Sequence, residues 1–246
     1  MVFRRGVESD GIVPGGVQER FPGFDTLQQA STWDAVTAGV VLARLGRPPD
    51  LRYFTVEEEA VGHHLFNQLL DQREPPYVPV LELVDARLAE HQTDGWHYAD
   101  MPEDGEAFRR SFAGLDDDAR SRFGRPFAAV EWNDQAGLIE QVQATSGDWH
   151  GMSARHVWSL WTRYGCAAFY SHPYAWNEIG FGGPAYPRGY KNLGLDKLEP
   201  WEVRDHVNLD PTHHAASTRG SAGPSAPLDA KPQHDGSAPR PAGGTA

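Results

Sequence analysis

Apolar residues recur at helical spacing through most of the chain. The clearest case is a run in which Val157, Trp161, Tyr164 and Ala168 stand at positions i, i+4, i+7 and i+11, which places them on one helix face. Runs in which β-branched and polar residues alternate, the pattern of a half-buried strand, are weak throughout. The pattern therefore predicts an all-α fold, an irregular helical domain of about six to seven helices.

Start and stop signals mark several of these helices. Thr55 followed by Glu58 is a capping-box pattern, and Pro79 suits the first turn of a helix. Gly124 and Pro126 end the helical pattern that precedes them. Ser153 is the expected cap of the helix that contains Trp161. The helices are expected within residues 33–45, 55–70, 79–88, 106–112, 116–123, 134–144 and 153–168.

The helical pattern occupies the middle of the chain. We expect an extended N-terminal segment over residues 1–32, a helical domain over residues 33–206 and a tail over residues 207–246. Serine, alanine, glycine, proline and aspartate dominate the tail, and no aromatic residue follows Trp201. Such a composition buries too little apolar surface to offset the entropy of ordering, so we expect the tail to be disordered.

A long segment after the last main helix has an unusual composition. Residues 169–201 contain eight aromatic residues, five glycines and four prolines. Glycine and proline at this density prevent a long helix or a regular strand. Disordered segments are poor in aromatic residues, whereas long ordered loops are usually functional. We therefore expect an ordered aromatic loop that packs against its own core, against a partner, or against both.

Composition and charge exclude some partners. Among 246 residues, 34 are acidic and 22 basic, which gives a net charge of −12. Such a surface repels phosphate backbones, so no nucleic acid is expected as a partner. No apolar run approaches the ~18 residues that a membrane span requires.

The N-terminal sequence bears on the cellular compartment. Arg4-Arg5 begins a twin-arginine pattern, but Glu8 and Asp10 stand where an export signal needs an apolar stretch. Without a complete signal we expect a cytoplasmic protein; the alternative is an extracytoplasmic protein that is exported with a partner.

Catalytic and cofactor motifs are incomplete. Gly180, Gly182 and Ala185 match the dinucleotide fingerprint in form, but a helix precedes them and Pro184 and Pro187 prevent a helix from following. We interpret this stretch as a glycine turn and expect no cofactor in this chain. The chain has no Glu-x-x-His motif of the kind that di-iron bundles use.

Two single candidates are also weak. Glu59 and His63 lie one turn apart, but one such pair cannot complete a metal site. Cys166 lies in the last main helix among Tyr164, Ala167 and Ala168, so we expect a small buried hydrophobe rather than a nucleophile.

One metal hypothesis stays open. His150, His156, His172 and Glu178 surround the last main helix and could converge in space, and histidine with glutamate suits zinc. Their spacing matches no established ligand pattern. The alternative reading is therefore a stand-alone metal-binding enzyme that uses these four residues.

Several stretches, in a fixed order, resemble one protein family. They include Tyr53-Phe-Thr-Val-Glu-Glu, Leu83-Val-Asp-Ala-Arg-Leu, Gly95-Trp-His-Tyr, Phe169-Tyr-Ser-His-Pro-Tyr, Gly180-Phe-Gly and Tyr186-Pro-Arg-Gly-Tyr190. From Tyr53 to Trp201 the chain resembles the gluconate 2-dehydrogenase subunit 3 family, the small subunits of flavin-dependent sugar and sugar-acid dehydrogenases. It departs from that family at Ala175-Trp176, where many members have two glycines, and in lacking a complete twin-arginine signal.

The resemblance implies a non-catalytic accessory subunit that has no cofactor of its own. Its partner would be a flavoprotein of the glucose-methanol-choline (GMC) type, which would hold FAD and oxidise a sugar, sugar acid or alcohol; a cytochrome subunit is a further candidate partner. The small subunit would stabilise or mature that partner. A helical protein that binds some other partner through the same loop is a further alternative. The expected interface residues are Tyr170, His172, Tyr174, Trp176, Asn177, Phe181, Tyr186, Arg188 and Tyr190.

Overall fold

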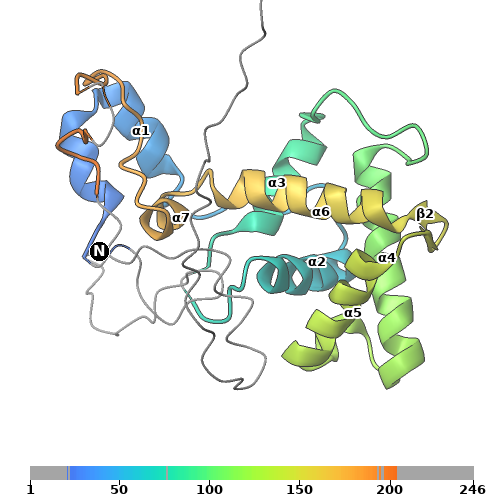
Figure 1. Cartoon of the computed structure of the whole chain (residues 1–246). Helices are drawn as coiled ribbons and strands as arrows, with labels where there is room; N and C mark the ends of the chain where they lie inside the picture. Colours follow the sequence, from blue (N-terminus) through green and yellow to red (C-terminus); the bar gives the residue numbers. More distant parts are fainter. Residues whose placement is uncertain (1–20, 22, 76, 193, 195–196, 204–246) are drawn as a thin grey trace, which may run out of the picture. The chain divides into compact units, whose positions relative to one another are not determined.

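The computed structural model describes residues 21, 23–75, 77–192, 194 and 197–203, and the expected all-α fold is confirmed (Figure 1). The predicted tail, residues 207–246, lies outside the described residues. The α-helices are α1 (Ala35–Ala43), α2 (Val56–Leu69), α3 (Val80–Ala89), α4 (Asp104–Phe123), α5 (Trp132–Ala144), α6 (Ala154–Phe169) and α7 (Pro173–Glu178). Two 3-10 helices, η1 (Thr26–Thr32) and η2 (Phe127–Ala129), and two short strands, β1 (Asp148–Trp149) and β2 (Met152–Ser153), complete the elements.

Local sequence signals account for several helix ends. The Thr55 hydroxyl accepts a hydrogen bond from the Glu58 amide at 3.3 Å, and the Glu58 carboxylate accepts one from the Thr55 amide at 2.8 Å. These two bonds are the predicted capping box. Gly124 ends α4 in the left-handed conformation, with φ 69°. Ser153 stands at the N-cap of α6 as expected, but its side chain makes no capping hydrogen bond.

Three helical parts of the chain differ from the sequence prediction. Residues 104–123 form one continuous helix where two short helices were expected. Gly114 at its centre is needed for close packing, because an added Cβ would lie 2.8 Å from the Trp149 ring. Thr26–Thr32, expected to be extended, forms η1 because the Asp25 carboxylate accepts a hydrogen bond from the Leu27 amide. Within the aromatic loop, Pro173–Glu178 forms the short helix α7.

A small hairpin precedes α6 and was not predicted. Asp148 pairs with Ser153 and Trp149 with Met152 in an antiparallel register. The turn residues, His150 and Gly151, both have positive φ, 50° and 77°. The hairpin has only two residues in each strand, which is too few for an alternating pattern to be recognised in the sequence.

The main core is built around α6. The predicted stripe on this helix faces inward, and Trp161 and Tyr164 are fully buried. Their polar atoms are satisfied: the Trp161 indole donates to the Ser111 hydroxyl at 2.9 Å, and the Tyr164 hydroxyl donates to Asp104 at 2.6 Å. α6 packs against α3, α5, α4 and α2, so the clearest apolar stripe of the sequence lies within the largest cluster.

A second, smaller cluster lies apart from the main core. Trp33, which follows η1, Val41 of α1 and Trp176 of α7 are its buried members. We call residues 26–45 together with residues 170–190 the aromatic module. The module therefore joins segments that are about 130 residues apart in sequence, as in the contact between Arg44 and His172.

Candidate interaction surface

His172 fixes the start of the aromatic loop. It is the N-cap of α7, where its Nδ1 accepts a hydrogen bond from the Tyr174 amide at 3.2 Å. Its Nε2 lies 2.9 Å from the Arg44 carbonyl oxygen and donates to it. Burial lowers the pKa of His172, which favours the neutral ring that these two bonds require. His172 thus ties the end of α1 to the start of α7.

Trp176 is the central ring of the aromatic module. Its indole donates to the Tyr170 carbonyl oxygen at 2.7 Å, and its ring packs with Trp33 and Val41. The Arg44 guanidinium lies over the same ring, 5.8 Å from its centroid. Burial of this ring against Trp33 and Val41 contributes apolar contact that holds α7 to the N-terminal segment.

Two polar residues of the loop also bind within the chain. The Asn177 side-chain oxygen accepts a hydrogen bond from the Thr26 amide at 2.8 Å. Arg188 donates to the Thr32 hydroxyl at 2.8 Å and to the Gly182 carbonyl at 2.7 Å, and its guanidinium lies 4.1 Å from the centroid of the Trp201 ring. The loop therefore folds back on its own N-terminal segment through His172, Trp176, Asn177 and Arg188. A contact of these four residues with a partner stays a prediction.

The glycines of the loop allow the N-terminal aromatic rings to approach. A Cβ added at Gly183 would lie 2.4 Å from the Trp33 ring, and one added at Gly180 would lie 2.7 Å from the Phe21 ring. Both glycines have positive φ. No helix follows them in residues 181–192. The stretch is thus a turn that admits aromatic rings, and the strand–turn–helix context of a dinucleotide site does not occur there.

Other rings of the same loop face outward. Tyr186 is 67% exposed, Tyr190 55% and Phe181 38%, and Tyr170 is also exposed. Phe181 packs edge to face on Trp176, with ring centroids 5.3 Å apart. Tyr174 is half-buried. The predicted interface residues are therefore divided between internal contacts and the surface.

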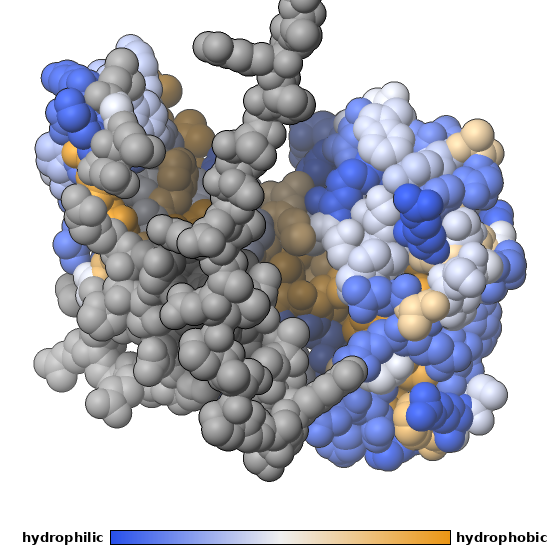
Figure 2. All heavy atoms as spheres, in the orientation of Figure 1, coloured by the Kyte–Doolittle hydropathy of each residue, from blue (hydrophilic) through white to orange (hydrophobic). Residues whose placement is uncertain are grey.

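Helix α1 adds an exposed apolar face that the sequence reading missed. Val36 is 74% exposed and Val40 54%, although their spacing would ordinarily mark a buried face, and Val41 is the buried residue of this helix. The sequence feature that could have indicated this exposed apolar face is the absence of any charged residue from Ala35–Ala43, which leaves the helix without a charged side for water. Figure 2 shows orange, apolar residues at the surface where α1 lies in Figure 1. We define the exposed apolar set as Val36, Val40, Leu42, Phe181, Tyr186 and Tyr190.

The candidate metal residues do not converge. His150 Nε2 lies 2.8 Å from Asp118 of α4, at the turn of the hairpin. His156 Nδ1 lies 2.8 Å from Asp100, and its ring stacks on Tyr98. His172 binds the Arg44 carbonyl, as described above, and Glu178 ends α7. In the part of the chain that the structure describes, no group of three or more histidine, cysteine, aspartate or glutamate residues is arranged to hold a metal ion.

Cys166 differs from its sequence interpretation. It is exposed on α6 rather than buried, because it stands outside the stripe of Val157, Trp161, Tyr164 and Ala168. Enough of its thiol is covered that burial raises its pKa. A raised pKa disfavours the thiolate, so nucleophilic chemistry at Cys166 gains no support.

Comparison with known proteins gives one family. The profile of the family described as gluconate 2-dehydrogenase subunit 3 matches residues 57–183, which run from the start of α2 to the glycine turn after α7. No curated protein and no solved structure matches the chain. No helix among the described residues is long and apolar enough to cross a membrane. Since the matched stretch is more than half of the chain, this protein belongs to the gluconate 2-dehydrogenase subunit 3 family.

Proposed function

We propose that this chain is a non-catalytic accessory subunit that binds and stabilises or matures an FAD-dependent dehydrogenase of the GMC type. The partner would hold FAD and oxidise a sugar, sugar acid or alcohol, and the complex could include a cytochrome subunit as a third member. Membership of a family of dehydrogenase subunits supports a role within a dehydrogenase complex. The exposed apolar set supports the mode of action, and it is the observation that carries the proposal.

The physical argument concerns the cost of leaving these side chains in water. Large apolar groups on a monomer surface mark interaction sites when they gather on one element, and aromatic residues dominate the binding energy of interfaces. α1 exposes Val36 and Val40, which lie one turn apart. Phe181 is also exposed, and its ring packs on Trp176, which belongs to the same buried cluster as Val41 of α1. A partner that covers these residues removes apolar area from water and stabilises both chains.

The compartment follows from the partner in this proposal. We propose a cytoplasmic complex, with export on a signal of the flavoprotein as the alternative. Fractionation of cells that express both chains distinguishes the two locations. The FAD-dependent dehydrogenase activity and this chain would appear together in the cytoplasmic fraction in the first case and together in the extracytoplasmic fraction in the second.

Co-expression tests the proposal. The chain is produced together with a GMC-type flavoprotein of the same organism, and the two should elute together in size-exclusion chromatography, with more soluble flavoprotein than when the latter is expressed alone. Separate elution together with an unchanged yield of active flavoprotein would contradict the proposed function. Turnover of a sugar or alcohol by the isolated chain would contradict its non-catalytic part.

A matched pair of variants locates the contact. Val36→Asp places a charge in the first turn of α1, and Val56→Asp places the same charge in the first turn of α2, at a residue of similar exposure (74% and 76%). An acidic residue suits both helix starts, so neither variant should impair folding. We expect Val36→Asp to weaken association and Val56→Asp to leave it unchanged.

A further inference from the structure

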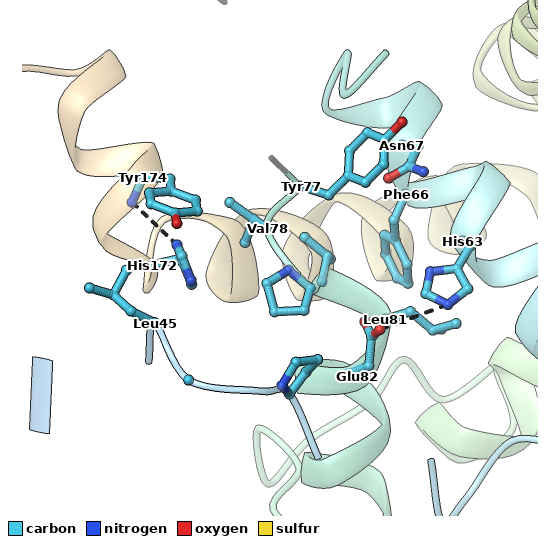
Figure 3. A pocket seen from close by; sticks show the side chains of 14 residues that line it. Leu45, His63, Phe66, Asn67, Tyr77, Val78, Leu81, Glu82, His172 and Tyr174 are labelled. Carbon is cyan, nitrogen blue, oxygen red and sulfur yellow. Dashed lines mark hydrogen bonds and ion pairs between the residues drawn. The ribbon is translucent and has the colours of Figure 1, made fainter. Parts of the chain in front are cut away.

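A groove separate from the exposed apolar set lies beside α2 and α3 (Figure 3). Its volume is about 360 Å³, at the lower end of the range for sites that hold small ligands or single side chains. Its apolar lining includes Leu45 and Pro48, which follow α1, Phe66 of α2 and Leu81 of α3. The His172 and Tyr174 side chains lie at the end nearest α7 in Figure 3.

A carboxylate lies at the opposite end of the groove. Glu82 Oε1 is 3.8 Å from His63 Nε2, and Glu59 Oε1 is 3.7 Å from the same nitrogen. Both distances exceed the limit for a direct hydrogen bond. Glu82 Oε2 is buried and has no hydrogen-bond partner among the described residues, and its side chain is only 18% exposed. A covered carboxylate with an unpaired oxygen carries an incompletely compensated negative charge, so a cation held in the groove stabilises it by Coulomb attraction.

The charges and walls of the groove specify the ligand chemistry. Among the described residues that line it there is no lysine or arginine, while two carboxylates, Glu82 in the lining and Glu59 beside it, face His63. Phe66 and Tyr77 belong to the same lining. Apolar walls that lead to a carboxylate match a side chain with an aliphatic stem and a cationic end.

We propose that this groove binds a lysine or arginine side chain of the flavoprotein partner. The stem lies along Leu45, Pro48 and Leu81, and the ammonium or guanidinium group donates hydrogen bonds to Glu82. This inference rests on the proposed function and extends it, because it assigns a second contact region whose chemistry is electrostatic rather than aromatic. Such a contact gives the complex a defined orientation and a salt-dependent affinity.

The test compares two glutamine variants in the complex. Glu82→Gln keeps the size of the side chain and removes its charge, and Glu57→Gln removes one charge from the exposed first turn of α2, outside the groove. Glu82→Gln should raise the Kd for the flavoprotein by about thirtyfold, the lower end for breaking a buried charge pair. Glu57→Gln should leave the Kd within about twofold, as expected for an exposed charge.

Thermal unfolding of the free chain separates a binding role from a structural one. If Glu82 serves the partner, Glu82→Gln leaves the Tm unchanged or raises it, because it removes an incompletely paired buried charge. A lower Tm together with an unchanged Kd would show that the carboxylate stabilises His63 instead, and would overturn the inference. Equal Kd values for wild type and Glu82→Gln at an unchanged Tm would also overturn it and leave the proposed function intact.

A small-molecule experiment is independent of the partner. n-Butylammonium and 1-butanol share a stem and differ in charge, so each is titrated into the free chain while the His63 ring resonances are followed. We expect a saturable shift with n-butylammonium that Glu82→Gln abolishes, and a much smaller shift with 1-butanol. Equal shifts from the two compounds would overturn cation recognition. Failure of the wild-type chain to bind the flavoprotein in co-expression would instead refute the proposed function.

Discussion

The main core and the aromatic module use similar residues in opposite ways. In the main core, α6 turns Trp161 and Tyr164 inward, where both rings are fully buried. In the aromatic module, α1 has one buried residue, Val41, while Val36 and Val40 stay exposed, and Tyr186 and Tyr190 face outward. Aromatic and β-branched residues are therefore buried in the core in one region and exposed at the surface in the other. The difference depends on whether enough neighbouring elements are present to cover them.

The largest expected effect is in the main core. Trp161→Ala removes a fully buried ring and leaves the Ser111 hydroxyl without its indole donor. Replacement of a buried tryptophan by alanine costs ~3–5 kcal/mol of unfolding free energy, a large part of the stability of a typical domain. Urea denaturation followed by circular dichroism measures the loss. A change below about 1 kcal/mol would contradict the assignment of α6 as the centre of the fold.

A smaller and more local effect is expected at Trp176. Trp176→Ala removes the ring that joins α7 to Trp33 and Val41, so the aromatic module should loosen while the main core stays folded. Hydrogen exchange measured by mass spectrometry should become faster in α1 and in residues 173–190 and stay unchanged in α6. Equal acceleration in α6 would show that the two regions unfold as one unit.

Tyr186→Ala tests an exposed ring of the aromatic module, in contrast to the buried rings of the two preceding variants. Because Tyr186 is 67% exposed, its removal should change the unfolding free energy by less than about 0.5 kcal/mol. If the ring contacts the flavoprotein, the Kd should rise about tenfold or more, as for an aromatic residue at an interface. Isothermal titration calorimetry measures the Kd, and Trp96→Ala, which removes another exposed ring outside the module, is the control. Equal effects of the two variants would argue against a specific contact.

The smallest expected effect is a pH dependence from His172. Burial lowers the pKa of this residue in the folded state below the ordinary value of 6.5, so the unfolded chain binds more protons as the pH falls below 6.5. His172 therefore contributes stability that is present above pH 6.5 and is lost as the pH falls toward the folded-state pKa.

A variant isolates this contribution. His172→Gln should flatten the fall in Tm with pH below 6.5 relative to wild type. His64 also has a pKa lowered by burial, so the control is His64→Gln, which retains the contribution of His172. A wild-type slope in His172→Gln would assign the pH dependence to other groups.

The positions and ends of the helices could be predicted from the sequence more accurately than the side of each helix that is buried. The capping box of Thr55 and Glu58 and the inward stripe of α6 could be read directly, because hydrogen bonds between near neighbours and a long 3.6-residue period are local. The outward orientation of Val36 could not, because it depends on which distant segment covers α1. That segment is α7, whose Trp176 packs against the side of α1 that contains Val41.

The candidate site shows the same limit. The composition of residues 169–201 indicated an ordered aromatic loop, but its division into internal and exposed residues required coordinates. Asn177 binds the Thr26 amide, and Arg188 binds the Thr32 hydroxyl, across about 150 residues of sequence. The approach of Glu82 to Glu59 and His63 is likewise a tertiary contact between α2 and α3, which no local spacing rule contains.

The most direct test of the proposed interface is a hydrogen-exchange footprint of the chain bound to a GMC-type flavoprotein, compared with the free chain. If the exposed apolar set contacts the flavoprotein, binding slows exchange in α1 and in residues 181–190 and leaves α4 and α5 unchanged. Slower exchange confined to α4 and α5, with α1 and residues 181–190 as fast as in the free chain, would contradict this interface.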